Sequence, residues 1–183
     1  EKSMAEILRV LLPRILSFPW VLDENYFIRP HEGKSDLRRS IPKKLKGFAQ
    51  HKERTTGFVI IQDQDSCDCK QLKQELVDLC NAHHAENIKF LVRIVCHELE
   101  AWYLGDMQAL HAVFPRFNPD KYSKKAQFRQ PDACVNPKLT LKDIVGSYSQ
   151  ITTAKKIASY INIETNCSES FKQFVSGIRR FIQ

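Results

Sequence analysis

The sequence has no apolar run long enough to span a lipid bilayer, and no secretory signal is visible in it. An integral membrane protein and a secreted protein are therefore not expected. The six cysteines do not form the framework of a small disulfide-rich domain, and 43% of the 183 residues are hydrophobic. These features predict a cytoplasmic protein with reduced thiols and a core of ordinary size.

Two familiar site patterns are only partly present. Gly33-Lys34-Ser35 has the form of the end of a nucleotide-binding P-loop, but Ile28 stands where the first glycine is needed, so a P-loop is rejected. Cys67 and Cys69 have a C-x-C spacing, with three histidines further along the chain. A second matching pair is missing, so zinc is a weaker alternative than the metal site that follows.

An acidic turn follows the most apolar strand that the sequence predicts. Phe58 to Ile61 is a continuous β-branched and aromatic run, typical of a strand buried on both faces, and Asp63 and Asp65 come directly after it. Two carboxylates that point the same way repel each other unless a cation joins them, and Mg²⁺ prefers oxygen ligands. The stretch predicts a magnesium site, with Mn²⁺ as a substitute. In the alternative interpretation, Asp65, Ser66 or Asp68 only caps the next helix.

A second strand is predicted over residues 88–95, and it also ends in acids. Glu98 and Glu100 follow it, beside His97. Ligands of open α/β sheets bind outside the carboxyl ends of the strands, so either acid is a candidate metal ligand. If this segment is already helical, the two side chains diverge and only one of them points to the site.

The chain is basic, with a net charge of +7. A basic chain with an acidic centre suits a polyanionic ligand bound through metal. Lys34 lies in the turn before a basic helix predicted over residues 37–48, and Arg38 and Arg39 lie at its start; all three are candidate contacts to nucleic-acid phosphates. The alternative is a solvated helix face.

The other elements follow from periodicity and capping signals. Ser3-Met4-Ala5-Glu6 predicts a capping box for a first helix, and Tyr26-Phe27-Ile28 predicts a short strand. Further helices are expected over residues 3–16, 68–84, 107–114, 139–148, 152–160 and 168–182. Residues 115–137 have little periodicity and form either a mobile loop over the site or a plain connection.

The order of these elements and acids resembles the Toprim domain of topoisomerases, primases and OLD-family nucleases. The resemblance is carried by Glu1-Lys2-Ser3-Met4, Asp63-Gln64-Asp65-Ser66 and Glu98-Leu99-Glu100-Ala101-Trp102, together with His31-Glu32-Gly33-Lys34-Ser35-Asp36. These motifs are similar to a small bacterial Toprim-like family found beside AAA- or ABC-type ATPases, in several cases in phage-defence settings.

The resemblance implies an α/β fold with a mostly parallel sheet, helices on both faces and a helical C-terminal extension. Residues 1–114 would form the Toprim-like catalytic domain, and residues 115–183 a loop and helical extension packed on it. Glu1 would match the first acidic motif of the family, although the strand that normally precedes that motif is absent from this sequence. Glu32 is a second candidate for the same role, and Glu1 is preferred because the second predicted strand precedes Glu32.

The resemblance further implies a Mg²⁺-dependent nuclease that acts on DNA or RNA, the effector of an ATPase-associated defence system. Glu1, Asp63 and Asp65 would be catalytic and, with Glu98 or Glu100, would bind the metal. Partners would be nucleic acid and an ATPase, with no membrane. Two alternatives remain: a non-catalytic partner or regulator of an ATPase, and a haloacid-dehalogenase-like phosphatase, which also uses a DxD motif after a strand.

Overall fold

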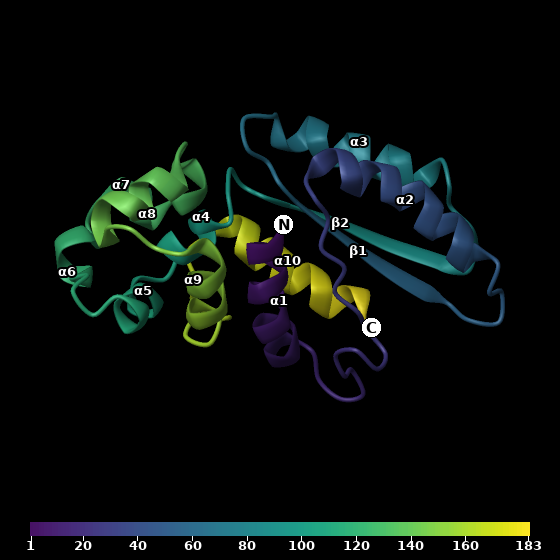
Figure 1. The fold of residues 1–183 in the computed structure, drawn as a ribbon, viewed down its shortest axis with the longest axis horizontal. Coiled ribbons are helices and arrows are strands. Elements are labelled where there is room, and N and C mark those ends of the chain that lie inside the picture. Colours follow the sequence, from purple (N-terminus) through teal and green to yellow (C-terminus); the bar gives the residue numbers. More distant parts are fainter.

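The computed structural model describes residues 1–183, apart from the side chain at position 126. Two strands and ten α-helices follow one another along the chain, with one 3₁₀ helix (Figure 1). The elements are α1 (Lys2–Ile15), α2 (Lys34–Ala49), β1 (Thr56–Asp63), α3 (Cys69–Asn81), β2 (Ile88–Val95), α4 (Glu100–Leu104), α5 (Met107–Val113), α6 (Pro119–Tyr122), α7 (Ala126–Arg129), η1 (Pro131–Ala133), α8 (Pro137–Val145), α9 (Gln150–Ile157) and α10 (Glu169–Phe181).

β1 and β2 form a two-stranded parallel sheet with helices on both faces. The register pairs Thr56 with Ile88 and Asp63 with Val95, so both strands end at the same edge. Figure 1 shows α2 and α3 on one side of the strands and α1 and α10 on the other. The prediction of an α/β fold with a parallel sheet, helices on both faces and a helical C-terminal part is confirmed.

Alternate side chains of the strands enter two separate cores, as the two-residue period of a strand requires. Ile60 and Val92 pack with α2 and α3, whereas Ile61 and Leu91 pack against the larger cluster on the other face. The larger cluster contains the fully buried Trp102, which stacks on Phe174 of α10 with ring centroids 5.0 Å apart. The sheet therefore has a core on each face, and the polar turns begin at the carboxyl ends of its strands.

Helix starts agree with the sequence at some places and not at others. The Asp68 side chain accepts a hydrogen bond from the Gln71 amide, and that of Asp106 accepts one from Ala109, so both residues cap helices as short polar side chains commonly do. The capping box predicted at Ser3 is wrong. Helix α1 already begins at Lys2, and no side chain caps it among the described residues.

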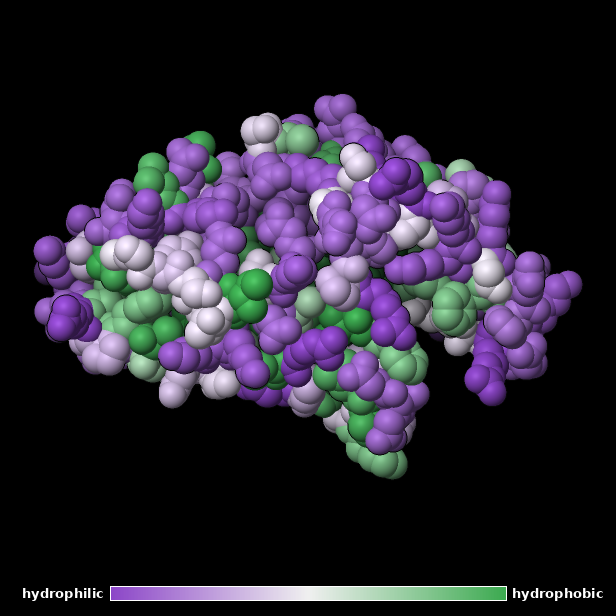
Figure 2. Space-filling view, viewed as in Figure 1, coloured by the Kyte–Doolittle hydropathy of each residue, from purple (hydrophilic) through white to green (hydrophobic). Residues whose placement is uncertain are grey.

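The strand predicted at Tyr26-Phe27-Ile28 is also wrong. The loop between α1 and α2 contains a single bridge between Leu22 and Tyr26. Asn25 fixes a local turn there, because its side chain accepts a hydrogen bond from the Val21 amide at 2.8 Å. This loop leaves Phe18 93% exposed and Phe27 52% exposed. Figure 2 shows hydrophobic atoms gathered on the protrusion at the lower edge, where Figure 1 places this loop.

Residues 115–137 contain α6, α7 and η1, and they are tied to the rest of the chain. Phe117 and Phe128 are buried in the larger core. Asp132 accepts hydrogen bonds from the Ser168 hydroxyl at 2.7 Å and from the Ser170 amide at 2.6 Å, at the start of α10. Because α10 packs on β2, the C-terminal residues cover one face of the sheet. The division into two parts at residue 114 stays a prediction.

Among the described residues, no helix is both long and apolar enough to cross a membrane.

Candidate metal centre at the ends of the parallel strands

The two turns that follow β1 and β2 are hydrogen-bonded to each other. The Gln64 amide donates to the Val95 carbonyl at 2.9 Å, and the Asp65 amide donates to the His97 carbonyl at 2.7 Å. Asp65 and His97 both adopt a positive φ, of 52° and 56°. The chain therefore bends sharply after each strand, at adjacent places. These bends bring the acids that follow the two strands to one edge of the sheet.

Asp63 is the last residue of β1, and it is the most perturbed acid of the site. Its Oδ1 atom is fully buried and has no hydrogen-bond partner among the described residues. Burial, with the negative charges of Glu1, Asp65 and Glu100, raises the pKa of Asp63 to about 8. A buried carboxylate without a partner is costly, so the site needs either a proton or a cation at this atom.

Glu100, at the first position of α4, is buried as a whole residue, whereas Asp63 is half-buried. Glu100 is 6% exposed, and its Oε1 atom accepts a hydrogen bond from the Tyr148 hydroxyl at 2.9 Å. Burial raises the pKa of Glu100, and the hydrogen bond from Tyr148 opposes that rise. Burial, with the nearby charges of Glu100 and Asp63 among others, raises the pKa of Tyr103 well above its usual value. Tyr103 and Tyr148 therefore belong to the surroundings of the site.

Neither tyrosine was predicted as a site residue. Tyr148 lies in the turn between α8 and α9, 48 positions from Glu100. No local sequence signal connects two residues so far apart, because their contact exists only after α8 has packed on α4.

Glu98 does not share the position of Glu100. Its Oε2 atom accepts a hydrogen bond from the Lys138 amide at 3.2 Å, in the first turn of α8. A carboxylate at a helix N-terminus is stabilised by the free amides there. Its charge acts on Glu100 but is not among the charges that raise the pKa of Asp63. The structure therefore assigns Glu100 to the acidic cluster and Glu98 to the start of α8.

The candidate phosphate-binding residues have different surroundings. Lys34, at the start of α2, forms an ion pair with Asp65. Arg38 donates a hydrogen bond to Glu75 of α3 at 2.6 Å, which links the two helices. Arg39 is exposed, and it forms no ion pair within the described part of the chain. Of the three, Lys34 contacts an acid of the DxD motif directly.

The four acids, Glu1, Asp63, Asp65 and Glu100, provide the oxygen atoms that a hard divalent cation prefers. The unpartnered Oδ1 of Asp63 fits such a cation, because it is the one buried acid oxygen of the cluster left without a donor among the described atoms. Among the described residues, however, no three acidic, histidine or cysteine side chains stand close enough together to hold an ion as they are. Asp65 pairs with Lys34 through one oxygen, Oδ2, so a metal bound by Asp65 would share this carboxylate with Lys34 or displace it.

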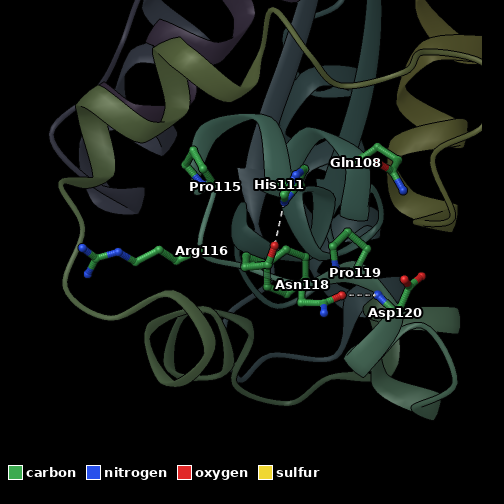
Figure 3. A pocket seen from close by; sticks show the side chains of 8 residues that line it. Gln108, His111, Pro115, Arg116, Asn118, Pro119 and Asp120 are labelled. Carbon is green, nitrogen blue, oxygen red and sulfur yellow. Dashed lines mark hydrogen bonds between the residues drawn. The ribbon is translucent and has the colours of Figure 1, made fainter.

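Two hollows of the molecule lie away from the acids. The hollow in Figure 3, of about 460 Å³, is formed by α5, α6 and the residues between them. His111, which lines this hollow, donates a hydrogen bond from Nδ1 to the Phe117 carbonyl at 2.7 Å, and this bond fixes its ring. None of the four acids lines it. All six cysteines are free.

The fold and the site define an α/β protein with an acidic cluster at the carboxyl ends of parallel strands. The chain belongs to the family described as Domain of unknown function (DUF4276), whose model matches residues 1–179. No curated protein and no solved structure matches the chain.

Proposed function

We propose that the protein is a Mg²⁺-dependent nuclease that hydrolyses phosphodiester bonds of DNA or RNA, with Mn²⁺ as an alternative metal. The buried and unpartnered Oδ1 of Asp63, surrounded by three further acids, is the observation that carries this proposal. Burial and the repulsion of neighbouring acids both disfavour the charged form of this carboxylate, and a bound cation offsets both costs. Glu1, Asp63, Asp65 and Glu100 would hold the metal.

When bound, the metal would polarise the phosphate and lower the pKa of an attacking water. The residues of the chain would do the rest. Lys34, next to Asp65, would move to a phosphate oxygen once the cation takes over Asp65. Arg39 is free to contact a flanking phosphate, whereas Arg38 would first have to leave Glu75. The basic surface would hold the backbone without reading bases.

The resemblance to Toprim-like proteins extends the proposal to context. It supports a cytoplasmic effector of a phage-defence system that works with an AAA- or ABC-type ATPase. In this setting, the Lys34–Asp65 ion pair would keep the site inactive until metal and substrate arrive together.

A second candidate is a non-catalytic regulator of an ATPase, and the same ion pair favours it. Lys34 already supplies a positive charge to Asp65, and the acids are not grouped as a ready metal site among the described residues. The phosphatase alternative would use Asp63 as its nucleophile, and it needs the same ionised carboxylate that the metal ligand of the nuclease needs.

The proposal is tested with the purified chain, labelled DNA and RNA, and MnCl₂ or MgCl₂, with and without a candidate ATPase. We expect metal-dependent cleavage by the wild type that Asp63→Asn abolishes. Asp143→Asn, which changes an exposed acid on α8, is the matched control. Mn²⁺ binding without cleavage of any substrate supports the regulator. Phosphomonoester hydrolysis without nuclease activity supports the phosphatase, and a wild type that does not bind Mn²⁺ excludes the metal site.

A further inference from the structure

A tyrosine hydroxyl meets the buried acid of the site, Glu100. The Tyr148 hydroxyl donates to Oε1 of Glu100 at 2.9 Å, and Glu100 is 6% exposed. A buried carboxylate can swing between rotamers unless a second residue fixes it, and such supporting contacts tune metal ligands. The hydrogen bond holds one oxygen of Glu100 and so determines how its other oxygen is presented.

Tyr148 is itself held in place from two sides. Its ring packs edge to face against Phe114 at the end of α5, with centroids 6.5 Å apart. The turn that carries it begins at Gly146, whose φ of 84° favours glycine, and ends where Ser149 caps α9. The hydroxyl is therefore fixed relative to both α5 and α9, and its hydrogen bond fixes Glu100 in turn.

Resting on the proposed function, we propose that Tyr148 is a positioning residue that orients Glu100 as a ligand of the divalent cation. The α8–α9 turn then belongs to the metal centre, although it supplies no ligand. Its role differs from that of a cap or a core residue, because it acts on the cation only through Glu100.

The test is the affinity of the whole chain for Mn²⁺, measured by calorimetry. Tyr148→Phe keeps the ring against Phe114 and removes the hydroxyl. We expect the apparent Kd for Mn²⁺ to rise by about 10- to 100-fold, the usual effect of losing a supporting contact. Tyr160→Phe, at an exposed tyrosine, is the matched control and should leave the Kd unchanged.

A double-mutant cycle separates positioning from general loosening of the fold. In a Glu100→Gln background, Tyr148→Phe should have no further effect on Mn²⁺ binding, because the group that it orients is gone. An additional loss of the original size would mean that Tyr148 acts elsewhere, and would overturn the inference. If Tyr148→Phe does not fold, Phe114→Leu removes the ring that holds Tyr148 in place and leaves both Tyr148 and Glu100 unchanged. We then expect a severalfold weaker affinity, and an unchanged one would overturn the inference.

The two proposals fail in different ways. Equal Mn²⁺ affinity of the wild type and a folded Tyr148→Phe variant overturns the role of Tyr148 and leaves the nuclease standing. A wild type that does not bind Mn²⁺ overturns both.

Discussion

Lys34 at the start of α2 forms an ion pair with Asp65, the second acid of the DxD motif. The pair is partly exposed, so its net contribution to stability is small. Its position matters more than its strength. If Asp65 were to serve as a metal ligand, the ammonium group of Lys34 and the cation would compete for the same carboxylate.

Replacing Lys34 should change metal binding and cleavage in opposite directions. Lys34→Met removes the competing charge, so we expect Mn²⁺ affinity to rise by about two- to fivefold. Cleavage at saturating metal should fall by roughly 10- to 100-fold, because a charged hydrogen bond to phosphate is lost. Calorimetry and initial rates measure the two effects. Lys43→Met, at an exposed lysine of the same helix, is the control. If Mn²⁺ affinity and cleavage rate both rise or both fall in Lys34→Met, the transfer of Lys34 from Asp65 to a phosphate is contradicted.

Asp63 makes the stability of the metal-free protein depend on pH. Burial and neighbouring acids raise its pKa to about 8 in the folded state, whereas the ordinary value is 3.8. Between these two values the folded state keeps a proton that the unfolded state has released, so stability falls as pH rises from about 4 to 8. Urea unfolding in EDTA across this range measures the decline.

Asp63→Asn should flatten this profile and raise the free energy of unfolding at pH 8, on the order of 2 kcal/mol. The amide cannot ionise, so the repulsion from the other acids is absent. Asp143→Asn should leave the profile as it is. A wild-type profile that rises with pH over the same range would show that Asp63 ionises freely in the folded protein.

Substitutions of Glu98 and of Glu100 should have different effects on Mn²⁺ binding and on stability. Glu100→Gln removes a charge from the acidic cluster, so we expect weaker but still measurable Mn²⁺ binding in a protein that stays folded. Glu98→Gln should keep Mn²⁺ binding within about twofold and lower stability by about 0.5–1 kcal/mol, because the contact with the first turn of α8 weakens. The reverse result would assign the metal to Glu98.

Arg38 and Arg39 provide a matched pair for nucleic-acid binding. Arg39 has no ion pair within the described residues, whereas Arg38 is bonded to Glu75. Arg39→Ala should reduce the slope of log affinity against log salt by about 0.7–0.9, the value for one phosphate contact. Arg38→Ala should change it less. Titrations at several salt concentrations decide this, and equal slopes for all three proteins would leave α2 as a solvated face.

The elements that the sequence predicted correctly have strong local signals. β2 has the predicted bounds of 88–95, because a β-branched run is bounded by turns at both ends. Asp68 and Asp106 mark helix starts for the same local reason. Tyr26-Phe27-Ile28 has the composition of a strand, but a strand also needs a neighbour, and the chain offers it a single bridge to Leu22. Helix α4 was not predicted, because five residues buried on all sides show no period.

The acids of the site could be found from the sequence, but their surroundings could not. Asp63 ends β1 and Glu100 follows β2, and parallel pairing brings the carboxyl ends of the two strands together. The choice between Glu98 and Glu100 depends on where α8 begins, and the role of Tyr148 depends on the packing of α8 on α4. Periodicity contains neither piece of information.

The hydrogen bonds between the two post-strand turns also determine how the acids move. The Gln64 side chain accepts from the His97 amide at 3.2 Å, in addition to the two backbone bonds that join these turns. The amide hydrogens of Gln64 and Asp65 should therefore exchange with solvent as slowly as those of β1 and β2, and more slowly than those of a surface loop. The two turns that carry the acids then unfold and refold as one cooperative unit with β1 and β2. A molecule that binds and immobilises either turn therefore restrains the other turn too.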